Sequence, residues 1–422
     1  MDSQATAIPS DHPTVASKRD NAQVRLGPVI ALIDGEHHPP AVRDALERLA
    51  GSRDLAGVVL VGRGEKLPPG PVADLYGRPV RDDPERALRD LAGSAEAVVD
   101  LADEPALAAT ARLRLASLAL HLGLAYEAPG MRLDPPVYEP LAFRGPSLAV
   151  IGTAKRTGKT AVAGHWAGLL RDAGLDPVMV CMGRGGPAEP RVAEAATALD
   201  DLLAIVEAGG HGASDYLEDA VLAGVRTVGC RRVGGGPTGA PQESTVVAGA
   251  ELAASLKPGV LLFEGSGACV PPVEVDRTVC VAGAGAAEPF ADYRLLRADL
   301  VLAAPDAPVD GFRFELRPEP AEALAPGARV ALFTTRAGGC EGADPVVVST
   351  NLARREALAA DLDRAAAERC NVYLTELKAA AVDTVAVRAR AEGARVAFVR
   401  NRPVGLDGDL DSELMALVSR GG

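Results

Sequence analysis

The sequence predicts an α/β protein whose main parallel sheet carries helices on both faces and is preceded by a smaller α/β domain. Two observations predict this fold. Short β-branched apolar runs alternate with helix-length segments along most of the 422 residues, as in parallel sheets whose strands are joined by helices. One of these runs, within residues 147–170, passes through a glycine- and threonine-rich turn directly into a helix.

The first part of this pattern, residues 24–140, predicts one Rossmann-like α/β unit. Its expected strands are 28–33, 57–61 and 97–101, and its expected helices are 41–50 and 105–122. Residues 1–23 mix acids, prolines and polar residues, so they are expected to form a flexible tail and not a signal or transit peptide. Five prolines between Ala128 and Pro146 predict a linker without regular structure at the end of the unit.

The alternation continues through residues 141–304, which are expected to form the main core. The expected strands there are 147–151, 177–182, 225–230, 259–263, 278–282 and 299–303, with helices at 158–173, within 191–223, at 244–256 and at 286–297. Residues 305–422 are expected to complete the core and to cover its site. Their expected strands are 329–333, 346–350, 371–375 and 395–399, with helices at 353–369 and 378–392, while the Pro- and Gly-rich stretch 305–345 is expected to hold a small subdomain or cover.

The turn after strand 147–151 has the pattern of a phosphate-binding loop, or P-loop. Gly158, Lys159 and Thr160 form its GK[ST] element, in which backbone N–H groups and the helix N-terminus surround a phosphate. Lys159 is predicted to contact the β- and γ-phosphate oxygens of ATP, and the Thr160 hydroxyl is predicted to bind Mg²⁺. The residues predicted to lie along the nucleotide are Gly152, Thr153, Ala154, Thr157 and Gly158. The alternative is a glycine turn between two core elements.

This loop departs from the common P-loop spacing. Gly152 lies six positions before Gly158, and Thr153 occupies the usual place of the first glycine. Lys155 and Arg156 add two cations that a nucleotide alone does not require. We therefore predict that Lys155 and Arg156 act in catalysis together with Lys159.

A second acidic motif follows the apolar strand 259–263, in the sequence GVLLFEGSG. Glu264 at the end of this strand is placed like a Walker B carboxylate, and it is predicted to hold Mg²⁺ across from Thr160 and to act in catalysis. The alternative is a buried glutamate with a structural role. The two motifs together predict a P-loop NTPase-like core.

Two further strands end in glycine-rich loops that carry arginine, in the sequences MGRGGP and CRRVGGGPTG. Because the carboxyl ends of parallel strands face one crevice, these arginines are expected to converge with the P-loop. The guanidinium fork suits phosphate, and glycine lets the backbone approach an anion. The residues predicted to bind a second, phosphate-bearing ligand are Arg184, Gly185, Arg231, Arg232, Gly235 and Gly236. Ordinary solvated surface arginines are the alternative.

Other polar positions are left open between a binding role and an ordinary turn. Asn351 and Asn401 follow strands 346–350 and 395–399, where α/β nucleotide enzymes place base-recognition groups. Lys378 either reaches a phosphate or begins a helix. The segment DGEHHPP either binds a metal or polar substrate or forms a solvated turn; its polar side chains are Asp34, Glu36, His37 and His38.

The composition excludes several classes of protein. There are 57 acidic against 44 basic residues, a net charge of −13, and 3% aromatic residues, which argues against nucleic-acid binding. The longest apolar runs are strand-length, so no membrane span is predicted. Six cysteines without a CxxC pair predict reduced core residues in a cytoplasmic protein and no structural zinc site.

Eight short segments spread along the chain carry a family resemblance. They are IDGEHHPP, GTAKRTGKTAVAGH, MGRGGP, RRVGGGPTG, FEGSGACVPPV, NLARR, TELKAAAVD and NRP. With these segments the sequence resembles the cyclic 2,3-diphosphoglycerate synthetase family along nearly its whole length. The resemblance implies ATP-dependent closure of a phosphoanhydride between the two phosphates of 2,3-diphosphoglycerate, with release of ADP and phosphate. That substrate carries about four to five negative charges near neutral pH, which matches the predicted surplus of arginine and lysine.

Two other classes of protein are kept as alternatives. The P-loop paired with the EG-x-G strand end is also similar to the carboxylate-activating dethiobiotin and cobyrinic acid amide synthetases. Ala154 replaces their acidic P-loop residue, and together with Lys155 and Arg156 this favours an anionic co-substrate. A nucleotide-dependent switch or metallochaperone needs no second anion pocket. The oligomeric state, with a homodimer as one option, is left open.

Overall fold

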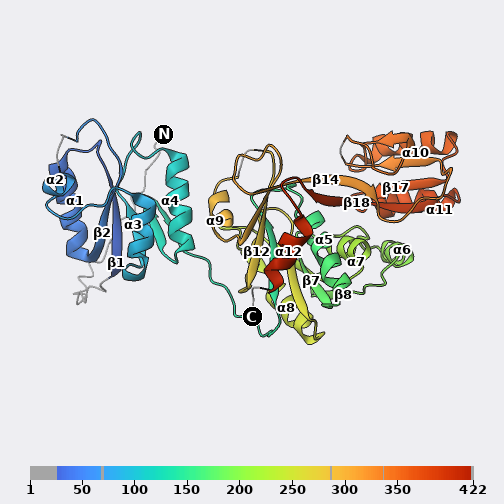
Figure 1. Ribbon diagram of the computed structural model, residues 1–422, viewed down its shortest axis with the longest axis horizontal. Coiled ribbons are helices and arrows are strands. Elements are labelled where there is room, and N and C mark those ends of the chain that lie inside the picture. Colours follow the sequence, from blue (N-terminus) through green and yellow to red (C-terminus); the bar gives the residue numbers. More distant parts are fainter. Residues whose placement is uncertain (1–25, 68–70, 286–287, 336, 420–422) are drawn as a thin grey trace, which may run out of the picture.

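The computed structural model describes residues 26–67, 71–285, 288–335 and 337–419, and the expected tail, residues 1–23, lies outside them. The chain forms an N-terminal, a central and a C-terminal part in sequence order (Figure 1). Mixed α/β structure with mainly parallel sheets confirms the predicted fold class.

The N-terminal part contains a five-stranded sheet in the order β2-β1-β3-β4-β5. Its strands are β1 (Leu26–Asp34), β2 (Arg53–Gly62), β3 (Ala97–Asp100), β4 (Ala125–Ala128) and β5 (Met131–Leu133). Its helices are α1 (Pro39–Ser52), α2 (Val72–Tyr76), α3 (Pro84–Leu91) and α4 (Ala109–His121), with a short 3₁₀ turn, η1 (Ala92–Ser94). Strands β1 to β4 pair in parallel, as the alternating pattern predicts.

The predicted linker contains more regular structure than expected. Strand β5 pairs antiparallel with β4, so the expectation that residues 128–146 lack regular structure is wrong at their start. The physical reason is local: Gly130 adopts a φ of 74° and supplies the hairpin turn, and residues 130–134 contain no proline.

The central part is built on the parallel strands of a larger sheet. These strands are β6 (Ser147–Gly152), β7 (Pro177–Gly183), β9 (Arg226–Val233), β11 (Val260–Gly265), β12 (Arg277–Ala282) and β13 (Leu300–Ala303); two short strands, β8 (Arg191–Ala193) and β10 (Glu243–Ser244), pair antiparallel with β9. The central helices are α5 (Lys159–Asp172), α6 (Leu199–Glu207), α7 (Asp215–Ala223), α8 (Val246–Ser255) and α9 (Ala291–Leu296). The sheet order β9-β7-β11-β6-β12-β13 places the P-loop strand β6 beside β11, the strand that ends at Glu264.

The two faces of strand β6 support two separate hydrophobic cores. Val150 packs on the face covered by α5, together with Trp166, whereas Ile151 packs on the opposite face with Val246 of α8. Two expected helices are shorter than predicted: residues 191–193 form a strand, and the helix expected at 286–297 is the short α9, with residues 286–287 outside the description.

The C-terminal part extends the same sheet, which has 13 strands in the described part of the chain. Its strands are β14 (Phe312–Pro320), β15 (Val330–Phe333), β16 (Pro345–Ser349), β17 (Val372–Glu376) and β18 (Arg395–Gly405). Its helices are α10 (Arg355–Ala367), a π-helical segment η2 (Ala381–Ala386), α11 (Val387–Ala391) and α12 (Leu410–Ser419). The predicted helix 378–392 is therefore divided into a π-helical and an α-helical segment.

Strand β14 was not predicted within the Pro- and Gly-rich stretch 305–345. It pairs antiparallel with β18, and these two long strands run from the central part to the C-terminal part (Figure 1). The sequence of β14, FRFELRPEP, alternates apolar with charged residues, which is the pattern of a half-buried strand, but it lacks the continuous apolar run by which the other strands were predicted. After β18 the chain returns to the core, where Leu414 of α12 packs in the same cluster as Trp166 of α5.

No helix in the described residues is long and apolar enough to span a membrane. All six cysteines are buried and free, as the spacing predicts.

Candidate active site

The P-loop folds around the side chain of Lys159. This residue is 4% exposed, and its ammonium donates hydrogen bonds to Ala154 O at 2.7 Å and to Thr157 Oγ1 at 3.3 Å. Gly158 has a φ of 105°, which favours glycine. A Cβ at Gly152 would lie 2.7 Å from Thr157 Oγ1, so the loop requires glycine there as well. The predicted strand, loop and helix thus enclose a cation at a helix N-terminus, which suits phosphate.

Burial lowers the pKa of Lys159 to about 8, although nearby Glu264 favours the charged form. We therefore expect Lys159 to take up a proton when ATP binds at about pH 8.5, because the phosphates of ATP raise the pKa of the lysine again. Below about pH 7 the lysine is already protonated and the uptake disappears. Calorimetric titration with ATP in the absence of Mg²⁺, in two buffers of different ionisation enthalpy, measures this proton uptake. Equal uptake by Lys159→Met would assign the proton to another group.

Glu264 lies opposite the P-loop and is fully buried. The Thr160 hydroxyl donates to its Oε2 at 3.3 Å, and the Cys181 thiol donates to its Oε1 at 2.7 Å. Burial raises the pKa of Glu264 to about 7, and Asp215 adds to this rise. The predicted Thr160 and Glu264 pair is therefore in contact.

Helix α7 brings a further set of acids that the sequence analysis missed. Asp219 is 2% exposed, and its Oδ2 has no hydrogen-bond partner in the described part of the chain. Burial raises the pKa of Asp219 well above its ordinary value, and Glu264 adds to the rise. Glu218 is also buried and pairs with Lys378 of the C-terminal part at 3.2 Å. The available signal was Asp215, Glu218 and Asp219 at spacings of three and four on a mostly apolar helix.

These side chains fit a hard divalent cation. One potential ligand atom from each of Cys181, Asp219 and Glu264 lies within 4.8 Å of the other two. Among the described residues, these three form the group of His, Cys, Asp or Glu side chains close enough to hold a metal ion. Two buried carboxylates so close together can both ionise only if a cation neutralises them. Mg²⁺ prefers oxygen, so Asp219, Glu264 and Thr160 are the suitable donors, while the Cys181 thiol orients Glu264.

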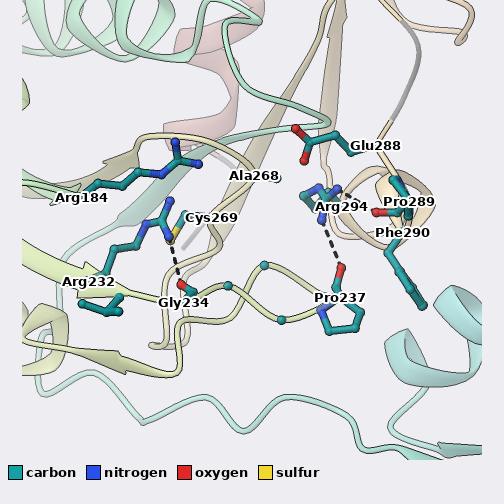
Figure 2. A pocket seen from close by; sticks show the side chains of 14 residues that line it. Arg184, Arg232, Gly234, Pro237, Ala268, Cys269, Glu288, Pro289, Phe290 and Arg294 are labelled. Atoms are coloured by element: carbon teal, nitrogen blue, oxygen red, sulfur yellow. Dashed lines mark hydrogen bonds between the residues drawn. The ribbon is translucent and has the colours of Figure 1, made fainter. Parts of the chain in front are cut away.

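A cavity of about 580 Å³ adjoins the P-loop, and three arginines line it: Arg184, Arg232 and Arg294 (Figure 2). Arg294 donates to Thr153 O in the P-loop at 3.2 Å, which joins the cavity to the nucleotide site. A Cβ at Gly267 would lie 2.3 Å from Arg184 Nη2 and 3.2 Å from Arg232 Nη2, so both guanidinium groups lie over this glycine. Gly235 and Gly236 also line this cavity.

The Glu288 carboxylate also lines this cavity, but no ion pair joins it to an arginine of the cavity in the described part of the chain. Arg232 is 6% and Arg294 2% exposed, and neither makes an ion pair with a described residue. Arg232 instead donates to the carbonyls of Gly234 and Ser266, and the Nε atoms of both arginines have no partner. Buried cations without carboxylate partners are costly, so this cavity is built for an anion.

The other predicted cations lie outside the lining of that cavity. Arg231 is exposed and donates to Gly186 O at 2.9 Å, because neighbouring residues of β9 point to opposite faces of the sheet. Lys155, Arg156 and Gly185 are exposed on the P-loop and the β7 loop.

The structure separates the two candidate asparagines. The Asn351 amide donates to Asp361 at 2.7 Å within the C-terminal part, so it holds the loop before α10. Asn401 lies on β18 and borders a cavity with Thr160. In DGEHHPP, buried Asp34 accepts hydrogen bonds from Glu36 N and from His37 N and Nδ1, and these bonds cap the turn.

The buried lysine, the glycine-rich loop and the threonine bonded to a strand-end carboxylate define a P-loop protein of the α/β class. Comparison with known proteins gives the particular family. The matching domain descriptions are the cyclic 2,3-diphosphoglycerate synthetase P-loop domain over residues 147–309, the N-terminal domain over 28–134 and the C-terminal domain over 338–402. The chain belongs to the cyclic 2,3-diphosphoglycerate synthetase family.

Curated relatives with that name support the assignment over almost full length. A Rubrobacter xylanophilus protein is 44% identical over 90% of this chain and 95% of its own. A Thermococcus gammatolerans protein is 38% identical over 90% of this chain and 94% of its own. One from Methanothermobacter thermautotrophicus is 34% identical over 93% of this chain and 96% of its own. The resemblance carried by the eight motifs is thus confirmed, and the carboxylate-activating alternative is not favoured.

Proposed function

We propose that this chain forms cyclic 2,3-diphosphoglycerate from 2,3-diphosphoglycerate, with ATP as co-substrate and ADP and phosphate as products. The observation that carries the proposal is the cavity beside the P-loop, whose buried Arg232 and Arg294 form no ion pair with a carboxylate among the described residues. A nucleotide bound on the P-loop leaves these cations unused, whereas a substrate with two phosphates and a carboxylate neutralises them.

The chain's own residues position the reactants in this proposal. Lys159 and the P-loop backbone hold the ATP phosphates, and Arg184, Arg232 and Arg294 hold the diphosphoglycerate, with Lys155 and Arg156 at the mouth of the site. Thr160, Asp219 and Glu264 would hold Mg²⁺, which supplies positive charge to the phosphate oxygens.

The reaction needs two displacements at phosphorus. One substrate phosphate oxygen attacks the γ-phosphorus of ATP, so a new phosphoanhydride forms and ADP leaves. An oxygen of the neighbouring substrate phosphate then attacks the phosphorus of the first, which closes the ring and releases inorganic phosphate. Phosphate oxygens are the nucleophiles throughout, so the protein contributes orientation and charge neutralisation.

A test is to measure ATP hydrolysis with Mg²⁺ in the presence and absence of 2,3-diphosphoglycerate and to follow the products by phosphorus NMR. We expect ADP to form only when this substrate is present, and the NMR signal of the cyclic phosphoanhydride to correspond to an amount of product equal to the ADP formed. ATP hydrolysis unaffected by the substrate would favour the nucleotide-dependent switch.

Asp219→Asn and Glu264→Gln are each expected to raise the Mg²⁺ concentration for half-maximal activity by about tenfold or more. An amide keeps the shape of the carboxylate but removes its charge. Mn²⁺ binding to the enzyme with ATP, followed by electron paramagnetic resonance, gives a second readout. Cys181→Ser is a control that retains a donor to Glu264, and unchanged metal titration in the amide variants would make both acids structural.

A further inference from the structure

A second, smaller cavity of about 160 Å³ lies within the C-terminal part, where residues of β14, β15, β17 and β18 line it together with residues 337–340. Leu316, Pro318, Leu332 and Val399 give it apolar walls, and Asn401 stands at its edge. The cavity adjoins the P-loop, since a Cβ at Gly158 would lie 3.0 Å from Leu316 Cδ1. A ligand whose phosphates lie on Gly158 can therefore reach it.

We propose that this cavity binds the adenine base of the ATP whose phosphates lie on the P-loop. The inference rests on the proposed use of ATP and assigns the part of ATP that the P-loop does not hold. Adenine needs flat apolar walls and a partner for its hydrogen-bonding edge. The volume suits one base and not a whole nucleotide, which agrees with phosphates held elsewhere.

Asn401 is the residue that would read the base. Its amide has no hydrogen-bond partner among the residues that the structure describes, and it offers an NH₂ group as donor and a carbonyl oxygen as acceptor. A carboxamide can pair with adenine N6 and N7 through both groups. The other polar groups of the cavity are engaged: Glu376 accepts from Thr335 N and Oγ1 at 2.8 and 2.7 Å.

A larger groove of about 440 Å³ also begins at Thr160 and includes Asn401. It follows α5 from Thr160 to Asp172, away from the P-loop, and its walls are strongly charged, with Glu218, Asp219 and Arg402 among them. Charged, solvated walls suit a base poorly, so we assign adenine to the apolar cavity.

The glycines of the two sites allow a matched experiment. A Cβ at Gly339 in the small cavity, or at Gly168 in the groove, meets no atom within 4 Å, so a leucine can be introduced at either site without a clash at Cβ. Calorimetry measures the binding of ATP and of inorganic tripolyphosphate to the full chain. Gly339→Leu and Asn401→Ala are expected to weaken ATP binding by about 5- to 150-fold and to leave tripolyphosphate binding unchanged. Gly168→Leu and Asn351→Ala are expected to change neither affinity.

Three results would overturn the assignment. These are unchanged ATP affinity in both Gly339→Leu and Asn401→Ala, an equal loss for ATP and tripolyphosphate, or a selective loss of ATP binding in Gly168→Leu. Thermal unfolding shows that each variant is folded. Substrate-dependent ATP hydrolysis by the unchanged protein tests the proposed function separately, so the adenine assignment can fail while that function stands.

Discussion

Turnover is expected to fall by at least about 10²- to 10³-fold when Lys159 is replaced by alanine, because in the proposed reaction its buried ammonium faces the phosphoryl group in transfer. Substrate-dependent ADP formation measures the loss. The binding of 2,3-diphosphoglycerate should change much less, since in the proposed site the arginines of the cavity provide its counter-charges.

The same substitution also removes a cation that lies near the buried Glu264. Glu264 and Lys159 stabilise each other's charged forms, so the pKa of Glu264 rises further when the ammonium is lost. Lys159→Met keeps most of the side-chain volume and separates this charge effect from a packing defect. Near-normal turnover in either folded variant would remove the P-loop lysine from the mechanism.

Sequence reasoning was most successful where function depends on neighbours along the chain. The strand, turn and helix around Lys159 and the acid at the end of β11 are local patterns, and the sheet order then brings Glu264 beside Thr160. The acids of α7 were missed because nothing in the sequence brings Asp219 of this helix beside Glu264. The contact arises from tertiary packing of the sheet.

The ribbon β14–β18 and the small cavity beside it illustrate the same limit. The alternation of apolar and charged residues in β14 is a local signal for a half-buried strand. The partner of Leu316, however, is a P-loop glycine far earlier in the chain, and no local pattern reveals that contact. Asn351 and Asn401 both follow predicted strands, so sequence position alone could not separate them. Only the pairing of β18 with β14 brings Asn401 towards the P-loop side of the sheet.

Arg231 and Arg232 are adjacent in sequence, and the structure predicts very different effects for them. Arg232 is buried and lines the cavity, whereas Arg231 is exposed and bonds to a backbone carbonyl. Arg232→Ala is expected to weaken the binding of 2,3-diphosphoglycerate by about 2–5 kcal/mol, as for a desolvated charge pair, with little change for ATP. Arg231→Ala is expected to have a much smaller effect because its charge remains in solvent.

Separate calorimetric titrations of ATP and 2,3-diphosphoglycerate decide between these expectations, and Arg232→Met tests whether lost packing explains the alanine result. Since Arg232 also donates to the carbonyls of Gly234 and Ser266, thermal unfolding must show that the loops remain ordered. Equal losses for the two arginines, or a loss confined to ATP, would place the second anion elsewhere. A large loss for Arg232 alone would mean that the side-chain alternation of one strand determines which of two neighbouring cations binds the substrate.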